Sequence, residues 1–200
     1  LGAEFSGLRF LWDQGVRCIP QPVVANEQLG YGVYEFIDGY KILPDDVGES
    51  DIDQAVRFLA RLNNLKHRDG SASLPKASEA CFSSDAIATN IGSRLGRLQK
   101  IECTGAQYNE MGTFLADEFE PLLDEVMDWC RDNLAETNTP FDAELTDEYK
   151  TLSPSDFGFH NALNRGGEVV FLDFEYFGWD DPAKTLSDFL LHPAMPLPEY

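Results

Sequence analysis

The sequence lacks any long apolar run, any paired-cysteine motif and any excess of basic residues. No stretch approaches the roughly 20 apolar residues that a membrane-spanning helix needs, so no membrane partner is expected. The four cysteines, Cys18, Cys81, Cys103 and Cys130, form no C-x-x-C pair, so neither a zinc site nor a disulfide framework is predicted. With no signal-peptide pattern at the start, we expect reduced thiols in a cytoplasmic protein.

Basic residues are outnumbered: 15 Lys and Arg oppose 35 Asp and Glu, which gives a net charge of −20 at pH 7. A nucleic-acid partner is not expected, because phosphate backbones select basic surfaces. The charge would suit a cationic substrate, and a solvated acidic surface explains it without any partner. Hydrophobic residues make up 43% of the chain, which is enough for the core of a globular protein.

Hydrophobic periodicity predicts a chain of mixed helices and strands. Helices are expected over 1–15, 51–66, 84–100, 108–134 and 182–191, with Pro121 kinking or splitting the fourth. Strands are expected over 23–25, 31–37, 162–163 and 168–174, and turns join them in two pairs. Because the chain starts with Leu1 inside a predicted helix, we expect a truncated start.

The residues that suggest chemistry lie on either side of the second predicted hairpin. They are Asp156, Asn161 and Asp173. An acid, an amide and a second acid are what phosphoryl transfer from ATP needs. Asp156 would accept the proton of an attacking hydroxyl, and Asn161 and Asp173 would be oxygen ligands of Mg²⁺. Asp173 also lies within the apolar run 169–174, where a carboxylate is costly without a partner.

These residues resemble a known family. Asp156-x-x-x-x-Asn161 followed by Asp173 resembles the catalytic loop and the metal-binding aspartate of the aminoglycoside phosphotransferase family. The run 173–176 is similar to the choline and ethanolamine kinase branch, and 181–189 resembles the signature that follows the metal aspartate. The resemblance implies that Asp156 is catalytic and that Asn161 and Asp173 bind the metal ion.

The resemblance extends to the first part of the chain. Residues 34–39 resemble the hinge strand between two lobes, which implies that the backbone from Glu35 to Ile37 holds the adenine of ATP. Glu4 stands where the family has a helical glutamate that pairs with a lysine on the phosphates. Considered alone, Glu4 could equally be an ordinary surface residue.

Two features depart from the family pattern. Pro154 replaces a histidine that usually precedes the catalytic aspartate by two residues, and His160 does not replace it in sequence. No glycine-rich loop or strand lysine precedes Glu4. A second interpretation therefore stays open, a catalytically inactive pseudokinase or nucleotide-binding module. A structural domain with a coincidental acid pattern is the third.

Other residues near the motif have alternative roles. Glu175 would bind a second metal ion or the substrate, or would be an exposed residue with a partner on its own strand. His160 is expected to be a satisfied loop histidine, and Asp188 to brace the catalytic loop. The aromatic residues of 157–179 are expected mainly in the core, with one or two beside a cationic substrate.

The resemblance implies an α+β, protein-kinase-like fold. Residues 1–39 would be the remnant of a small β-rich N-lobe with the hinge, and residues 40–200 a mainly helical C-lobe with a catalytic β-hairpin. The implied function is ATP- and Mg²⁺-dependent phosphorylation of a hydroxyl group on a small polar molecule, such as an aminoglycoside, an amino alcohol or a sugar. The chain alone is expected to be weak or inactive, because the lobe that covers the phosphates is missing. Neither the acceptor nor the oligomeric state follows from the sequence.

Overall fold

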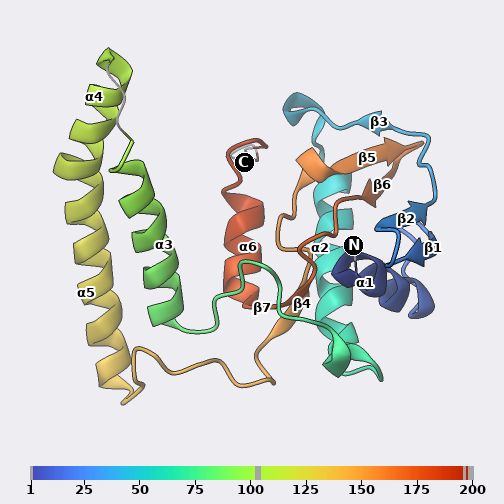
Figure 1. The fold of residues 1–200 in the computed structure, drawn as a ribbon, viewed down its shortest axis with the longest axis horizontal. Helices are drawn as coiled ribbons and strands as arrows, with labels where there is room; N and C mark the ends of the chain where they lie inside the picture. The colour runs from blue at the N-terminus through green and yellow to red at the C-terminus, as the bar shows by residue number, and fades with distance from the viewer. Residues whose placement is uncertain (1, 102–104, 196, 198–200) are drawn as a thin grey trace. The chain divides into compact units, whose positions relative to one another are not determined.

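The computed structural model describes residues 2–101, 105–195 and 197, which fall into two compact units (Figure 1). The first unit combines Leu1–Ala80 with Asp147–Tyr200, and the second is Cys81–Thr146. Cys103 lies outside the described residues. The predicted division between residues 39 and 40 falls inside the first unit and stays a prediction. No helix in the described part of the chain is both long enough and apolar enough to cross a membrane.

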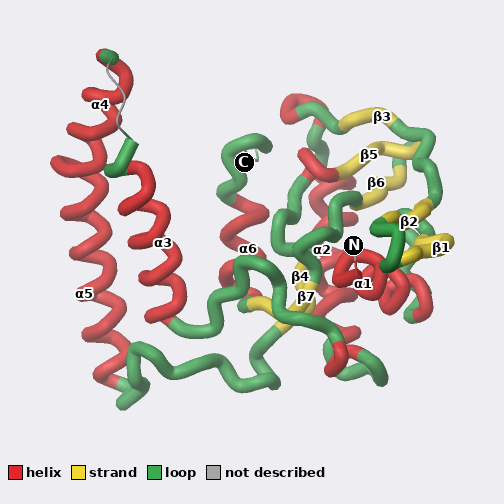
Figure 2. The backbone as a smooth tube through the Cα atoms, in the orientation of Figure 1, coloured by secondary structure: helices red, strands yellow, loops and turns green. Residues whose placement is uncertain are grey.

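Among its described residues, the first unit holds three small antiparallel sheets and three α-helices, which confirms the mixed architecture (Figure 2). Its helices are α1 (Gly2–Asp13), α2 (Glu49–Leu65) and α6 (Pro182–Leu190). Its strands are β1 (Pro22–Asn26), β2 (Tyr31–Tyr34), β3 (Tyr40–Lys41), β4 (Thr151–Ser153), β5 (Ala162–Arg165), β6 (Glu168–Phe171) and β7 (Gly178–Asp180). β1 pairs with β2, β5 lies between β3 and β6, and β4 pairs with β7.

The second unit is helical. It contains α3 (Ser84–Leu98), α4 (Ala106–Phe114) and α5 (Glu120–Glu136), and a π-helical turn over Leu115–Phe119 joins α4 to α5. This turn comes just before Pro121, which confirms the predicted interruption. Proline has no N–H and its ring crowds the carbonyl of the preceding turn, so the helix must widen there. α3 runs beside α5, and Gln99 contacts Glu120 between them (Figure 1).

The strands differ from the prediction in their lengths. β2 ends at Tyr34 and β6 ends at Phe171, whereas the predicted strands continue to residues 37 and 174. Asp173 has φ of 61°, a left-handed backbone conformation that ends a strand. The sequence analysis missed β3, β4 and β7, because strands of two or three residues carry no periodic pattern.

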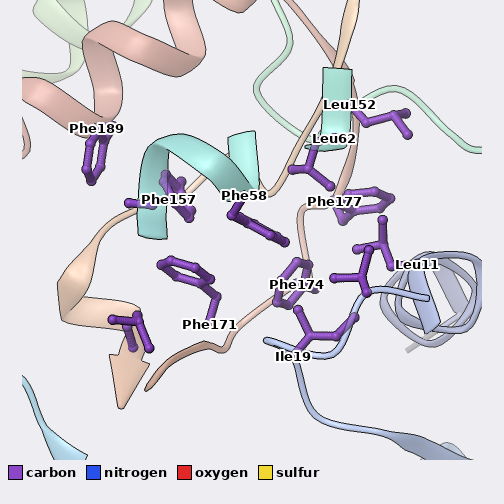
Figure 3. Close-up of a cluster of buried hydrophobic side chains, with 14 of the residues drawn as sticks. Leu11, Ile19, Phe58, Leu62, Leu152, Phe157, Phe171, Phe174, Phe177 and Phe189 are labelled. Carbon is purple, nitrogen blue, oxygen red and sulfur yellow. The ribbon is translucent and has the colours of Figure 1, made fainter. Parts of the chain in front are cut away.

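The core of the first unit combines aliphatic side chains with a group of phenylalanine rings that pack against one another (Figure 3). The rings of Phe58 on α2 and Phe171 on β6 stack with centroids 4.7 Å apart. Phe157 lies 4.9 Å from Phe171 and 5.1 Å from Phe189 on α6. Offset and tilted ring pairs of this kind add to the free energy gained by burying the rings.

This cluster fixes the positions of two carboxylates. Phe157 directly follows Asp156, and Phe174 directly follows Asp173. Both phenylalanines are buried, with exposed fractions of 2% and 0%. Because each ring is held in the core, the backbone that carries the preceding carboxylate has little freedom to move.

Gly178 on β7 leaves no room for a side chain. A Cβ atom there would lie against Pro75 O and only 2.5 Å from Ala77 N, which are both backbone atoms. We expect Gly178→Ala to lower the free energy of unfolding by about 1–3 kcal/mol, measured by urea denaturation. Gly2→Ala is the control in the same unit, because its Cβ would meet Glu27 Oε1 at an ordinary 3.6 Å. Equal stability of the two variants would contradict the prediction.

Candidate functional site

A tight turn after β4 presents Asp156. Ser155 has φ of 71°, and its N–H donates to the Ser153 hydroxyl at 3.0 Å. The N–H of Asp156 donates to Pro154 O at 3.1 Å. Because Ser153 and Ser155 are both buried, the turn is anchored in the interior of the protein. The Asp156 side chain remains 42% exposed, which a group that meets a substrate requires.

Asn161 is bonded directly to Asp156. Its side-chain amide nitrogen donates to the main-chain oxygen of Asp156 at 3.0 Å and to Asp156 Oδ2 at 3.2 Å. These bonds use the amide nitrogen, so the amide oxygen is the atom that can face a cation. The main-chain oxygen of Asn161 accepts from Leu172 N at 2.8 Å, which ties the loop to the segment that carries Asp173.

Asp173 lies at the surface of this site. The sequence analysis treated Asp173 as part of an apolar strand, and this is corrected: its left-handed backbone leaves it exposed while Phe174 is buried. Partial burial, followed by the negative charge of Glu175, raises the pKa of Asp173 above its usual range. The charge of Asp156 acts in the same direction. The structure therefore gathers carboxylates whose mutual repulsion a bound divalent cation would relieve.

Two histidines lie close to Asp156: His160, which the sequence analysis named, and His192, which it did not. His160 Nε2 lies 3.2 Å from Asp156 Oδ1, and His192 Nε2 lies 3.3 Å from the same oxygen. His192 follows α6, far from Asp156 along the chain, so no local motif could have placed it there. Burial, followed by the charge of His192, lowers the pKa of His160, while Asp156 counteracts the shift.

The arrangement of these histidines does not suit a shared metal ion, although the three ligand atoms lie within 4.8 Å of one another. The two rings are stacked, with centroids 3.9 Å apart and planes 10° from parallel. A histidine binds a metal ion in the plane of its ring. Near-parallel planes share no nearby point, so the rings cannot both bind one ion without turning.

A buried ion pair supports the strand that precedes α6. Asp180 on β7 is fully buried, and its carboxylate lies 3.5 Å from Lys184 Nζ. Burial raises the pKa of Asp180, and the positive charge of Lys184 acts against that rise. Asp188, which was expected to brace the catalytic loop, bonds to Lys184 on its own helix at 2.6 Å. Asp181 caps α6 by accepting from Ala183 N at 2.7 Å.

The segment predicted as a hinge is anchored by Glu35. Its N–H donates to Gln21 O at 2.9 Å, and its carboxylate accepts from Gln21 N at 3.1 Å. The same carboxylate lies 3.4 Å from Arg165 on β5. The N–H of Glu35 is therefore already hydrogen-bonded to Gln21. The peptide groups that follow it, as far as the buried Ile37, remain for the predicted adenine contact.

Glu4 lies half-buried on α1 and acts on the end of β2. Burial, followed by the negative charge of Glu4, raises the pKa of Tyr34 to about 12. The buried Tyr34 hydroxyl has no hydrogen-bond partner within the described part of the chain, and its ring lies 5.9 Å from that of Phe5. The interaction of Glu4 is thus with Tyr34, the first residue of the predicted hinge.

No protein-family model matches the chain, and a search of the curated proteins gives no match. Solved structures do match. The amicoumacin kinase hAmiN, solved in complex with AMP-PNP, Ca²⁺ and Ami, gives a TM-score of 0.57 at 16% identity, covering 98% of this chain and 55% of that one. An ethanolamine kinase from Plasmodium vivax gives a TM-score of 0.55 at 18% identity, covering 94% and 49%.

A choline/ethanolamine kinase family protein from Mesorhizobium loti also matches, with a TM-score of 0.53 at 20% identity, covering 94% of this chain and 54% of that one. The chain thus spans about half the length of the solved structures that it matches. At such low identity the likeness concerns the fold. The chain has the protein-kinase-like fold of the aminoglycoside phosphotransferase and choline kinase type.

Proposed function

We propose that the chain carries the catalytic loop of an ATP- and Mg²⁺-dependent phosphotransferase that acts on a hydroxyl group of a small polar molecule. The observation that carries this proposal is the bonded pair of Asp156 and Asn161 beside the exposed carboxylate of Asp173. The order and the chemistry of these groups are those that phosphoryl transfer uses. The kinase-like fold supports the same function.

Each of the three residues has a separate role in this proposal. Asp156 accepts the proton of the attacking hydroxyl through its exposed carboxylate. Asn161 and Asp173 offer hard oxygen atoms, which Mg²⁺ prefers, and the clustered negative charge at Asp173 favours a divalent cation. When bound, the ion would neutralise charge on the phosphates. Binding of the adenine by the backbone between Glu35 and Ile37 remains part of the proposal.

The acceptor belongs to the class of small polar alcohols, and we favour one that also carries an amine. Asp156, Asp173 and Glu175 place negative charge at the site, and the whole chain carries −20. The printed names of the similar structures refer to amicoumacin, ethanolamine and choline. An aminoglycoside, an amino alcohol or a sugar all fit a site of this chemistry.

The main alternative is an inactive nucleotide-binding module. Pro154, in place of the family's histidine, favours it. Incubation of the full-length protein with γ-labelled ATP, Mg²⁺ and panels of aminoglycosides, amino alcohols and sugars separates the two. We expect label on one acceptor class, and the 200-residue chain alone to be weak or inactive. Tight Mg²⁺-dependent nucleotide binding with no transfer to any panel would favour the inactive module.

A further inference from the structure

We propose that His192, together with His160, holds the carboxylate of Asp156 in its working orientation, and that His192 takes the place of the histidine missing at position 154. This role of His192 as a positioning residue deepens the proposed function and rests on it. His192 is not part of the catalytic-loop motif, because it reaches the site from the turn after α6.

The Nε2 atoms of both rings lie close to the same oxygen atom of Asp156. His160 Nε2 lies 3.2 Å and His192 Nε2 lies 3.3 Å from Asp156 Oδ1. Asn161 donates to the other oxygen, Oδ2, at 3.2 Å. His160 is hydrogen-bonded to Oδ1 and His192 Nε2 contacts the same oxygen, so the two histidines cover Oδ1. Oδ2 keeps an acceptor position, which points to it as the oxygen that takes the proton of the acceptor hydroxyl.

The hydrogen-bonding pattern of His192 fixes which of its nitrogens carries the proton. The N–H of Ala194 donates to His192 Nδ1 at 3.3 Å, so Nδ1 acts as an acceptor. A neutral imidazole that accepts at one nitrogen is protonated at the other. Nε2 of His192 therefore carries a hydrogen, and it lies 3.3 Å from Asp156 Oδ1, close enough for electrostatic attraction to the carboxylate. Met195, which is 3% exposed and packed in the core, anchors the turn that orients this ring.

The two rings also hold each other. They stack at 3.9 Å, and the side chains of His160 and His192 are only 15% and 21% exposed. Gly158 lies close beside His160 and leaves no room for a side chain, because a Cβ there would lie 2.7 Å from His160 Nδ1. The buried Nδ1 of His160 has no hydrogen-bond partner among the described residues. This packing leaves the Nε2 of His160 as the nitrogen that reaches Asp156.

Two substitutions separate the polar contact of His192 with Asp156 from the packing of its ring. His192→Phe keeps a flat ring for stacking and removes the donor, whereas His192→Gln keeps a donor near the position of Nε2 and removes the ring. For the full-length protein we expect His192→Phe to lower kcat roughly 10- to 100-fold, since a misplaced catalytic group costs that much. The KM for ATP should not change, and His192→Gln should recover most of the lost kcat.

His67 provides the matched control, because it is exposed and is the remaining one of the chain's 3 histidines. His67→Phe and His67→Gln should leave kcat unchanged. Wild-type kcat in His192→Phe, or equal losses in the Phe and Gln variants of His192, would overturn the proposal. A change in the KM of His192→Phe with unchanged kcat would also overturn it, because a positioning residue acts on the catalytic step.

Histidine nitrogen NMR on the full-length protein tests the contact without turnover and without a His192 variant. We expect a protonated Nε2 and a bare Nδ1 on His192, and faster exchange of the Nε2 proton in Asp156→Ala. A His192 protonated at Nδ1, or an Nε2 signal that Asp156→Ala leaves unchanged, would overturn the proposal. The expected signals in a protein that transfers no phosphate would contradict the proposed function while supporting the contact.

Discussion

Asp156→Asn is expected to lower kcat about 100- to 10,000-fold, which is the range for loss of a general base. Asparagine has nearly the same shape and keeps an oxygen that can accept from His160 and stay in contact with His192. It cannot take a proton from the acceptor hydroxyl at neutral pH. The buried Phe157 should hold the loop in place, so nucleotide affinity should stay close to that of the wild type.

The matched control is Asp53→Asn on α2. Asp53 forms an exposed pair with Arg57 at 2.6 Å, and exposed pairs contribute little to stability. Steady-state kinetics with a saturating acceptor measures kcat for both variants. Unchanged kcat in Asp156→Asn would remove Asp156 from the chemistry, and an equal loss in Asp53→Asn would show that the assay reports folding.

Asp173→Asn is expected to weaken the binding of the divalent ion and nucleotide by more than about 100-fold. Residues that merely support a metal ligand already contribute about 10- to 100-fold, so loss of a ligand's charge should exceed that. Asparagine is the right replacement because the backbone of Asp173 has φ of 61°, which asparagine tolerates and alanine does not. The effect therefore reports the charge and not a strained turn.

Mn²⁺ is a suitable probe, since carboxylate and amide oxygens bind it as they bind Mg²⁺. Electron paramagnetic resonance of Mn²⁺ in the presence of AMP-PNP gives the affinity for each variant. Asp147→Asn serves as the control, because the Asp147 side chain is 94% exposed and contacts Lys150. Equal Mn²⁺ affinity in wild type and Asp173→Asn would exclude Asp173 as a ligand.

The sequence predicted the parts of this protein that depend on local patterns. The helices appear close to their predicted bounds, and Asp156 and Asn161 lie together because one short loop carries both. The predicted hairpin of β5 and β6 is present, with its turn at Gly166 and Gly167, where positive φ angles require residues such as glycine. The roles of these residues in binding and catalysis stay predictions.

What the sequence could not show depends on contacts between distant segments. His192 reaches Asp156 only because α6 and the turn after it pack against the catalytic loop. In the sequence, nothing distinguishes Asp180 from the adjacent Asp181. Only the fold buries Asp180 beside Lys184. The apolar run before Asp173 suggested a buried strand, but a single left-handed residue places this carboxylate at the surface.

The most direct test of the account is calorimetric titration of AMP-PNP into the full-length protein, with and without Mg²⁺. We predict binding that requires Mg²⁺ and that Asp173→Asn abolishes. Binding that does not depend on the ion, or no binding to a protein shown to be folded, would contradict the assignment of Asn161 and Asp173 as metal ligands and the phosphotransferase function built on it.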